Sequence, residues 1–365
     1  MLVVLSGGGT AGHINPALAL ADTLAARGHD VRFAGTPNGA EARLVREAGI
    51  DFTPFEASGF NRNHPTTIFK GVYLIQKSTG AAKKWFAQIK PDVVVGFGGY
   101  VSIPVGRAAT QTGVPLVIHE QNSVMGMANK FLAKKAAKVC LTYEHAASAV
   151  ADKDKVVITG NPVRASVLAA TREESRELLG IPQDARLLLV TGGSLGAQHL
   201  NRALAALKDE LLAYDDLYII HVTGPKQLDE VTGLMELTPE QQQRWQLVGY
   251  TNQMGACMAA ADAIVSRAGA SSLAEISARA LPALLVPFPW ATEDHQTTNA
   301  RSYVESGCAF MIVDDEVETP EFGRLVHTLI EDAQVREAMT AAAHQLKTRD
   351  AAALLADIVE DAARR

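Results

Sequence analysis

Residues 5–24 read LSGGGTAGHINPALALADTL, and residues 189–207 read LVTGGSLGAQHLNRALAAL. Each stretch passes from an apolar strand through a glycine turn into an amphipathic helix that has an asparagine near its start. The pattern therefore restarts about halfway along the 365-residue chain. At about 150 residues per domain, this length also suggests two domains. We expect two Rossmann-like domains in tandem, joined near the NPVR segment at residues 161–164.

Short apolar runs alternate with helical patterns along the chain. They are LVVL (2–5), VRFAG (31–35), DVVVGF (92–97), PLVIHE (115–120), KVCLTY (138–143), RLLLVTGG (186–193), LYIIHVTG (217–224), WQLVGY (245–250), DAIVSRAG (262–269), PALLVPF (282–288) and AFMIVDD (309–315). Near-continuous Val, Ile and Leu runs are typical of parallel strands buried on both faces, with helices as the crossovers. The fold class is therefore α/β.

The expected architecture is two Rossmann-like doubly wound parallel-sheet domains facing across a cleft. The first domain spans residues 1–160 and the second spans residues 161–344. The final Ala-rich helical stretch has no strand after it, and we expect a C-terminal helix over residues 345–365 to join the first domain.

Composition excludes several other classes of protein. Hydrophobic residues make up 47% and charged residues 20% of the chain, as in globular domains. Cys140, Cys257 and Cys308 are far apart and form no CxxC pair, so neither a disulfide scaffold nor a cysteine metal site is expected. The N-terminal MLVVLSGGG lacks the basic region of a signal peptide, and no run approaches the about 18 apolar residues of a spanning helix. These features favour a cytoplasmic protein that does not cross a membrane.

Glycine-rich turns follow four of the expected strands. They contain Gly7, Gly9 and Gly12 in a G-x-G-x-x-G pattern, GFGGY at 96–100, GGSLG at 192–196 and SRAGASSLAE at 266–275. Such turns let a ligand approach the backbone, and the following helix N-terminus attracts anions. Because α/β sheets bind ligands at the carboxyl ends of their strands, phosphates and sugars are the expected ligands.

The first glycine turn does not carry the full dinucleotide signature. A dinucleotide fold places an acidic residue about 20 positions further on for the ribose. This chain has Gly35 and Thr36 at that place. NAD binding is therefore disfavoured, and a tight turn without a ligand remains the alternative to a phosphate site.

His13 is the leading catalytic candidate. It follows Gly12 at the start of a helix, and the ordinary pKa of histidine, about 6.5, suits a general base near neutrality. An incidental surface position is the alternative. His119 and Glu120 end a strand at the ligand edge of a sheet, where buried structural hydrogen bonding is equally consistent with the pattern.

Three further positions allow two interpretations each. Ser272 and Glu275 have the spacing of a capping box, although Glu275 also suits the hydroxyls of a ribose. Arg164, at the expected domain boundary, suits a diphosphate or an ordinary surface position. His295 and Gln296 follow Asp294 at a helix start, where capping explains the aspartate and a sugar would explain the other two.

Residues 60–140 contain nine Lys and two Arg against Asp92 and Glu120 only, although the whole chain has a net charge of −6. Lys70, Lys77 and Lys84 share one helical stripe, and Trp85 and Phe86 add aromatic surface. We expect this patch to bind an anionic membrane surface, with a solvated lysine face as the alternative. No nucleic-acid module is recognisable, so nucleic acid is not an expected partner.

Seven motifs occur in a specific order: GGGTAGHINPALALA, GFGGYVSIPVGRAA, HEQNSVMGMANK, GNPVR, GGSLGAQHLN, SRAGASSLAEI, and PALLVPF followed by DHQTTNA. This ordered set, from residue 1 to about 310, closely resembles the bacterial UDP-N-acetylglucosamine:N-acetylmuramyl-(pentapeptide) pyrophosphoryl-undecaprenol N-acetylglucosamine transferases. The tail resembles that family only in being helical.

The resemblance implies a glycosyltransferase B fold and a hexosyltransferase of peptidoglycan synthesis that forms lipid II from lipid I. It implies a peripheral position on the cytoplasmic face of the inner membrane, no cofactor or metal, and other cell-wall enzymes as candidate partners. The family's donor contacts fall here on Thr10, Ala11, Gly12, Asn122, Arg164, Ser194, Thr251, Ala270, Ser271, Ser272, Leu273, Ala274, Glu275, His295 and Gln296. The loops expected near the acceptor pyrophosphate contain Gly9, Gly98, Gly99 and Tyr100. Ala11 stands where some relatives have glycine, and His295-Gln296 where some have two glutamines.

Rival functions come from other classes. A dinucleotide oxidoreductase would need the missing ribose acid, and an exported sugar-binding protein would need a signal peptide. A UDP-sugar 2-epimerase or a transferase that glycosylates diacylglycerol shares the expected fold, so a panel of donors and acceptors is needed to separate them from the transferase.

Overall fold

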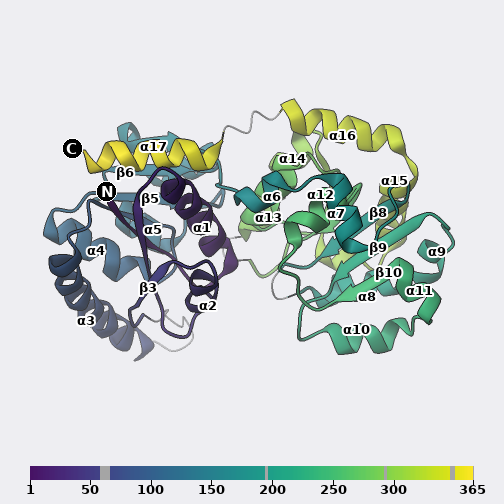
Figure 1. Cartoon of the computed structure of the whole chain (residues 1–365), viewed down its shortest axis with the longest axis horizontal. Coiled ribbons are helices and arrows are strands. Elements are labelled where there is room, and N and C mark those ends of the chain that lie inside the picture. Colours follow the sequence, from purple (N-terminus) through teal and green to yellow (C-terminus); the bar gives the residue numbers. More distant parts are fainter. Residues whose placement is uncertain (58–65, 194–195, 292–293, 346–349, 365) are drawn as a thin grey trace. The chain divides into compact units, whose positions relative to one another are not determined.

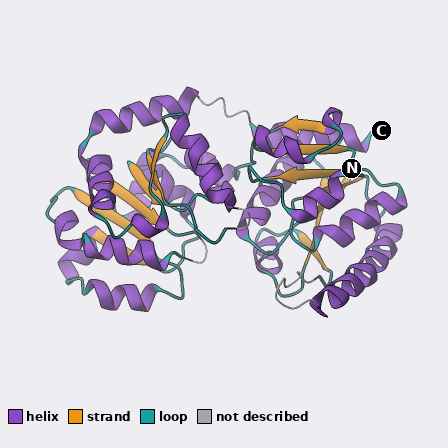
Figure 2. Cartoon of the chain, turned by 180° about the vertical axis from the view of Figure 1, so that it is seen from behind, coloured by secondary structure: helices purple, strands orange, loops and turns teal. Residues whose placement is uncertain are grey.

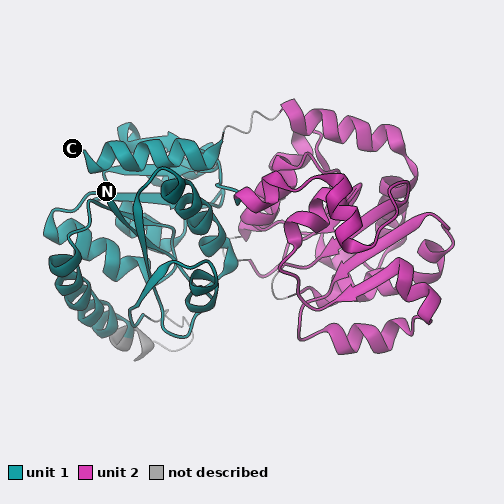
Figure 3. Ribbon diagram, in the orientation of Figure 1, with its two compact units in different colours: residues 1–164, 349–365 teal, residues 165–348 magenta. Residues whose placement is uncertain are grey.

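The computed structural model of the chain describes residues 1–57, 66–193, 196–291, 294–345 and 350–364. It divides into two compact units, residues 1–164 with 349–365 and residues 165–348 (Figure 3). These divisions fall after residues 164 and 348, where the sequence analysis places them after residues 160 and 344. Each unit is a parallel sheet covered by helices on both faces (Figure 2).

The first unit contains a seven-stranded sheet. Its elements are β1 (Leu2–Ser6), α1 (Ala11–Ala26), β2 (Asp30–Gly35), α2 (Ala40–Glu47), β3 (Asp51–Pro54), α3 (Thr66–Ile89), β4 (Val93–Gly96), α4 (Ser102–Thr112), β5 (Leu116–Glu120), α5 (Met127–Ala133), β6 (Lys138–Leu141), the 3-10 helices η1 (Glu144–Ala149) and η2 (Lys153–Lys155), β7 (Val156–Ile158) and α17 (Ala351–Ala363). The strand order is β3-β2-β1-β4-β5-β6-β7, and every neighbouring pair is parallel.

Alternate residues of the central strands face opposite layers of helices, as the two-residue period of a strand requires. Val4 and Val94 pack with α3, α4 and α5, whereas Val3 and Val95 pack with α1, α2 and α17. Both faces of these strands are therefore apolar, which accounts for the near-continuous valine and leucine runs in the sequence.

The second unit contains a six-stranded sheet. Its elements are α6 (Ala165–Ala169), α7 (Arg172–Leu179), β8 (Arg186–Thr191), α8 (Gln198–Ala206), α9 (Lys208–Leu212), β9 (Leu217–Val222), α10 (Leu228–Met235), α11 (Pro239–Arg244), β10 (Trp245–Val248), α12 (Met254–Ala260), β11 (Ala263–Ser266), α13 (Ala270–Ala278), β12 (Ala283–Leu285), α14 (His295–Glu305), β13 (Ala309–Met311), the 3-10 helix η4 (Asp314–Glu316), α15 (Pro320–Glu331) and α16 (Ala333–Gln345). The strand order is β10-β9-β8-β11-β12-β13, with parallel neighbours throughout.

Two strands, β3 and β7, are absent from the sequence-based assignment. β3 reads DFTP and β7 reads VVI, and each pairs with one neighbour at an edge of the sheet. Their residues are half-buried or exposed, so these strands lack the long apolar runs of the central ones. The other eleven strands lie within the expected runs or extend one residue beyond them, as β1 does at Ser6 and β2 at Asp30.

The last helix, α17, belongs to the first unit and lies along α1 (Figure 1). Leu355 and Val359 are fully buried in the same core as Leu18 and Leu24 of α1. Arg27 adds hydrogen bonds from Nη1 to Asp357 Oδ1 (2.7 Å) and to Glu360 Oε1 (3.1 Å). Apolar packing and exposed ion pairs thus hold the chain terminus to the unit in which the chain begins.

The strand order of the first unit reverses between β1 and β4. A glycine loop leaves the sheet at the end of each of these two strands. Gly99 has a φ of +79°, and a Cβ on this residue would lie 2.4 Å from the carbonyl oxygen of Gly8. The two loops therefore touch through their backbones at the place where α/β sheets commonly bind ligands.

The second unit repeats this arrangement with a different neighbour. Its strand order reverses between β8 and β11. In the loop after β8, a Cβ on Gly196 would lie 2.1 Å from the carbonyl oxygen of Thr223, which follows β9. Here too the loop closes on a neighbouring backbone because no side chain stands between them.

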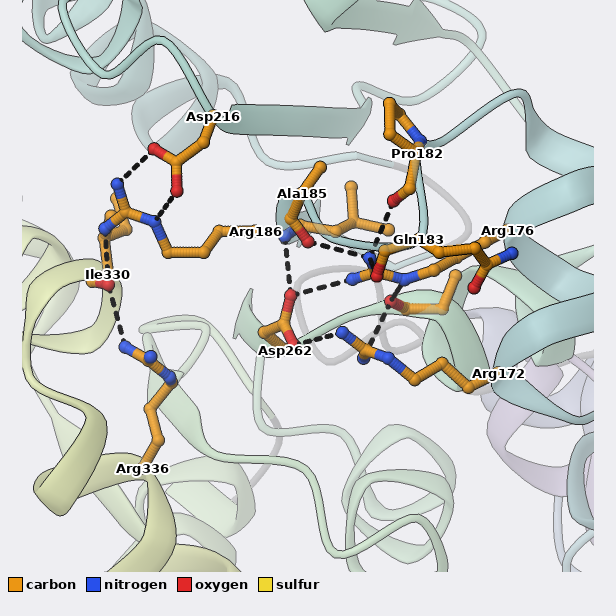
Figure 4. A network of polar contacts seen from close by, with 12 residues as sticks. Arg172, Arg176, Pro182, Gln183, Ala185, Arg186, Asp216, Asp262, Ile330 and Arg336 are labelled. Atoms are coloured by element: carbon orange, nitrogen blue, oxygen red, sulfur yellow. Dashed lines mark hydrogen bonds and ion pairs between the residues drawn. The ribbon is translucent and has the colours of Figure 1, made fainter.

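A buried arginine organises the amino edge of the second sheet (Figure 4). The side chain of Arg176 is fully buried and donates from Nη2 to Asp262 Oδ2 (2.9 Å) and from Nε to the carbonyl of Ala260 (3.0 Å). Asp262 also accepts from Arg172 and from the backbone N–H of Leu187. The Nη1 atom of Arg176 donates to the carbonyls of Pro182, Gln183 and Ala185. Helix α7 is thereby tied to the starts of β8 and β11.

Replacing Gly99 by alanine should open the contact between the two loops of the first unit. Gly113, with a φ of +77° and open space around its missing Cβ, is the matched control. Gly113→Ala should lose about 1 kcal/mol of unfolding free energy from backbone strain alone. Gly99→Ala should lose roughly 2 kcal/mol more, because the loop around Gly8 must move. Urea denaturation measures both, and equal losses would contradict the steric argument.

Replacing Arg176 by lysine should destabilise the second unit by about 3 kcal/mol, because buried carbonyls and Asp262 lose their partners. Arg202, which pairs with Glu230 where both side chains are about half exposed, is the matched control. Arg202→Lys should change the unfolding free energy by less than about 1 kcal/mol. Thermal and urea unfolding test this difference, which should vanish if the buried network is not stabilising.

Candidate functional site

His13 lies in the first turn of α1, where the loop after β1 turns into the helix. Its Nδ1 is 2.9 Å from the carbonyl oxygen of Gly8 and 3.3 Å from Oγ1 of Thr10. A carbonyl only accepts hydrogen bonds, so Nδ1 carries the proton in this arrangement. Nε2 is then the basic nitrogen of the neutral ring, which is the form that a general base requires.

The imidazole of His13 rests against the second glycine loop. A Cβ on Gly98 would lie 3.1 Å from Cδ2 and 3.2 Å from Nε2 of this ring. Tyr100, two residues further on, is 43% exposed. The structure therefore brings His13, Gly98, Gly99 and the loop that contains Gly9 together, as expected from the ends of β1 and β4.

Glu120 organises the third loop at this edge of the sheet. It is 2% exposed, and its two carboxylate oxygens accept from the N–H groups of Asn122 (3.1 Å) and Gly126 (2.9 Å) and from the side-chain amides of Asn122 (3.2 Å) and Asn129 (2.9 Å). Four donors around one buried carboxylate indicate a structural role. Asn122, a candidate donor contact, is thereby fixed beside Glu120.

His119 is also structural, one of the two interpretations that the sequence left open. The ring is fully buried, donates from Nε2 to the carbonyl of Gly160 (2.9 Å) and accepts at Nδ1 from Gln121 Nε2 (3.1 Å). Burial lowers the pKa of His119 to about 4, against the smaller opposing effects of the Gly160 carbonyl and Glu120. The ring is therefore neutral at physiological pH and already fully used.

Arg164 is the last residue of the first unit, and its partner there is Asp22 of α1. The distance from Arg164 Nε to Asp22 Oδ2 is 3.8 Å, and both side chains are more than one third exposed. Burial raises the pKa of Asp22, and the guanidinium partly offsets that effect. This loose pair leaves the guanidinium accessible to a stronger anion.

The candidate donor residues from Ala270 to Glu275 form the first two turns of α13. Gly269 is the N-cap of this helix, so Ser272 lies inside the first turn. The capping-box interpretation of Ser272 and Glu275 is therefore wrong: the serine is three residues too late to cap the helix. The helix N-terminus carries a partial positive charge at the carboxyl edge of the sheet, directly after β11.

Gln296 joins two loops of the second unit. Its Oε1 accepts from the backbone N–H groups of Ala268 (3.2 Å) and Phe288 (3.0 Å), and these residues follow β11 and β12. A ligand would therefore meet its Nε2 donor. His295 is the first residue of α14, and Asp294, its N-cap, has a φ of +51° and makes no side-chain cap hydrogen bond.

The remaining candidate donor positions lie on other loops or outside the described part of the chain. Thr251 follows β10, and its Oγ1 accepts from the N–H of Gln253 (2.9 Å). Thr10, Ala11 and Gly12 form the N-cap and first turn of α1. Ser194 lies outside the described residues.

The aromatic part of the expected membrane patch is wrong. Phe86 is 3% exposed and belongs to the core under α3, because its position on the helix faces the sheet. Trp85 is half-buried against Phe55, with ring centroids 5.5 Å apart. Among the side chains of α3 that the structure describes, the large exposed apolar ones are instead Val72 (49%) and Tyr73 (65%).

The structure describes the side chains of two of the three patch lysines. Lys77 and Lys84 are exposed, and Lys77 Nζ is 3.0 Å from Glu56 Oε2, which raises the pKa of the lysine. The side chain of Lys70 lies outside the described part of the chain. α4 contacts both α3 and α5, and α5 presents exposed Met127 and Phe131.

Glu41 is a buried residue of this site that the sequence reasoning missed. Its carboxylate reaches back from α2 to accept from Thr36 and Gly9, beside the end of β2. The dinucleotide pattern places its acid near Gly35 and Thr36, and Glu41 comes five residues after Thr36. An acidic residue in the first turn of the following helix was the available signal.

Within the ranges that the structure describes, no helix is both long and apolar enough to span a bilayer. No group of three or more His, Cys, Asp or Glu side chains in the same ranges is arranged to hold a metal ion.

Comparison with known families accounts for both units. Residues 3–141 match the glycosyltransferase family 28 N-terminal domain, and residues 187–355 match the glycosyltransferase family 28 C-terminal domain. The two matches include the glycine loops after β1, β4 and β8 and the candidate donor residues on α13.

The similarity to individual proteins extends over the whole chain. The chain is 37% identical to the UDP-N-acetylglucosamine–N-acetylmuramyl-(pentapeptide) pyrophosphoryl-undecaprenol N-acetylglucosamine transferase of Halothermothrix orenii, with 100% of both chains covered. It is 40% identical to the protein of the same name from Lactiplantibacillus plantarum, with 99% of each covered. The crystal structure of Acinetobacter baumannii MurG superposes with a TM-score of 0.74 at 30% identity, covering 99% of each chain.

Full-length similarity at this level, together with the two domain matches, shows that the chain belongs to glycosyltransferase family 28 and, within it, to the family of UDP-N-acetylglucosamine–N-acetylmuramyl-(pentapeptide) pyrophosphoryl-undecaprenol N-acetylglucosamine transferases.

Proposed function

We propose that this chain transfers N-acetylglucosamine from UDP-N-acetylglucosamine to the C4 hydroxyl of undecaprenyl-pyrophosphoryl-N-acetylmuramyl-pentapeptide, lipid I, and so forms lipid II for peptidoglycan. The observation that carries the proposal is the full-length similarity of 37 to 40% to enzymes named for this transfer. The product serves cell-wall synthesis and hence cell shape and division.

The second unit binds the donor in this proposal. The N-terminus of α13 faces the diphosphate of UDP, where its partial positive charge stabilises the departing anion. Glu275 accepts hydrogen bonds from the ribose hydroxyls, and the Nε2 amide of Gln296 donates to the sugar. Arg164, whose ion pair with Asp22 is loose at 3.8 Å, supplies a guanidinium to the same diphosphate.

The first unit supplies the base. The acceptor hydroxyl attacks the anomeric carbon as the bond from that carbon to the UDP oxygen breaks, and UDP leaves with the electron pair. The hydroxyl proton passes to Nε2 of His13, whose Nδ1–H is held by the Gly8 carbonyl. A single displacement inverts the anomeric centre and gives a β-1,4 bond. The loops with Gly9, Gly98, Gly99 and Tyr100 contact the acceptor near its pyrophosphate.

The protein acts as a peripheral protein on the cytoplasmic face of the inner membrane in this proposal, because its acceptor is anchored there by a lipid. The exposed lysines of α3, such as Lys77 and Lys84, would meet anionic headgroups, each contributing about 1 kcal/mol. The exposed Val72, Tyr73, Met127 and Phe131 would replace Trp85 and Phe86 as the apolar part of the patch. Other cell-wall enzymes are candidate partners at this surface.

Incubation with labelled UDP-N-acetylglucosamine and a lipid I analogue should place label in the lipid product. His13→Ala should lower kcat by about 10²- to 10⁴-fold, the usual effect of losing a general base. UDP affinity measured by calorimetry should stay within about twofold, because the side chain of His13 makes none of the donor contacts proposed above. His145→Ala, at an exposed histidine of the same unit, is the matched control and should keep full turnover. Unlabelled lipid would refute the function, and undiminished kcat in His13→Ala would refute the role of His13.

Reversing the charges of Lys70, Lys77 and Lys84 to glutamate should release the protein from anionic phospholipid vesicles. Sedimentation of the protein with vesicles, compared at low and high salt, measures this loss. Lys226→Glu, at an exposed lysine of the second unit, should bind vesicles as the natural protein does. Undiminished sedimentation of the triple variant would show that these lysines form only a solvated face.

A further inference from the structure

We propose that Glu41 is a positioning residue for His13 and acts through the peptide group between Gly8 and Gly9. The inference rests on the proposed function, because it concerns the histidine assigned there as the base. It adds a carboxylate that neither contacts His13 directly nor lies near it in sequence. The connection between them is a single peptide unit, bonded on both sides.

One side of this peptide faces the carboxylate. The N–H of Gly9 donates to Oε2 of Glu41 at 3.2 Å. The other carboxylate oxygen, Oε1, accepts from the N–H of Thr36 at 3.0 Å and from its hydroxyl at 2.6 Å. Glu41 itself is 0% exposed, so these bonds are not weakened by competition with bulk water.

The other side of the same peptide faces the imidazole. The carbonyl of Gly8 accepts from Nδ1–H of His13 at 2.9 Å. The sequence of groups is therefore carboxylate, peptide N–H, peptide carbonyl, imidazole Nδ1–H. This order matches a carboxylate–histidine pair of the kind that orients a catalytic imidazole, with one peptide group inserted between the two partners.

The inserted peptide transmits the charge because hydrogen bonds in a chain polarise one another. A carboxylate that accepts from the N–H draws the peptide dipole toward itself and makes the carbonyl oxygen more negative. That oxygen then binds Nδ1–H more strongly. It favours the tautomer with the basic Nε2 and stabilises the imidazolium that forms when Nε2 takes the acceptor proton.

The space around Glu41 is made by glycines. A Cβ on Gly8 would lie 2.3 Å from Oε1, a Cβ on Gly39 would lie 2.3 Å from Oε2, and a Cβ on Gly35 would lie 2.6 Å from Cγ. Glycines on three separate segments thus leave the space that the side chain of Glu41 occupies. This burial brings the carboxylate against the Gly8–Gly9 peptide and explains why a charged side chain lies in the interior.

Two polar side chains, Asn129 and His119, lie on the β5 side of this site. Asn129 Nδ2 would be 3.6 Å from a Cβ on Gly98, and the same amide is bonded to Glu120. His119 is neutral there and bonded to Gly160. Glu120 is already surrounded by four N–H donors, so Glu41 is the carboxylate that reaches the Nδ1 side of His13 through a peptide.

Glu41→Gln tests the proposal, because it keeps the size of the side chain and removes the charge. Selective ¹⁵N labelling of histidine, with His13→Gln used to assign the signal, reports which ring nitrogen is protonated in the neutral state. In the natural protein neutral His13 should carry its proton on Nδ1. In Glu41→Gln the Nε2-protonated tautomer should appear, kcat should fall about tenfold, and the KM for UDP-N-acetylglucosamine should stay within about twofold.

Thr36→Val is the matched control, because it removes a hydroxyl that binds Glu41 and leaves the charge and the contact with Gly9 in place. It should disturb the loop and lower the melting temperature while keeping the Nδ1 tautomer and most of kcat. If Thr36→Val and Glu41→Gln have the same effect on the tautomer and on kcat, Glu41 is only a structural anchor and the proposal is wrong.

The natural protein alone also tests the proposal, should Glu41→Gln fail to fold. A neutral His13 protonated on Nε2 would overturn it directly. The spectroscopic measurement needs no turnover, so it separates this inference from the proposed function. If no lipid product forms but His13 is protonated on Nδ1, the proposed transfer is refuted. The proposed link between Glu41 and His13 would still stand.

Discussion

The close contact between the backbones of Gly8 and Gly99 is the constraint on which the first unit's site depends. The two backbones lie too close for a side chain at Gly99, since a Cβ on this residue would lie 2.4 Å from the Gly8 oxygen. The contact fixes the Gly8–Gly9 peptide between two loops. His13 and Glu41 then bind opposite sides of that peptide. The orientation of the imidazole is therefore set by backbone geometry, which varies less than side-chain packing does.

Strand periodicity and glycine turns were enough to predict most of this fold, because both depend on local sequence. The central strands are apolar on both faces, and their ends are marked by glycines at the points where the strand order reverses. The edge strands β3 and β7 were not predicted, because half-exposed residues such as those of DFTP give no continuous apolar run. Phe86 was misplaced for a related reason. The stripe of α3 that faces the sheet cannot be distinguished from an exposed aromatic stripe until the sheet itself is known.

Contacts between residues that are far apart in the chain could not be predicted from the sequence alone. Gly9 and Glu41 are separated by 32 positions, and their hydrogen bond exists only because β1 and β2 are neighbours. Arg176 likewise meets Asp262, 86 positions away, because α7 packs over the starts of β8 and β11. The spacing of Ser272 and Glu275 led to the opposite kind of error, a predicted local contact that the structure does not contain. A local pattern suggested a cap, whereas the helix begins two residues before the serine.

The two units share a topology but differ in the charge beneath their first glycine loop. In the first unit the loop rests on the carboxylate of Glu41, and in the second unit the corresponding loop closes on the neutral carbonyl of Thr223. The carboxylate of Glu41 already accepts from the Gly9 N–H, and the Gly8 carbonyl of the same peptide holds Nδ1–H of His13. The first loop is thus suited to proton transfer, and the second unit, with the N-terminus of α13, is suited to a diphosphate. The two glycine turns are similar in sequence and do not reveal this difference, because Glu41, the residue that causes it, lies on α2.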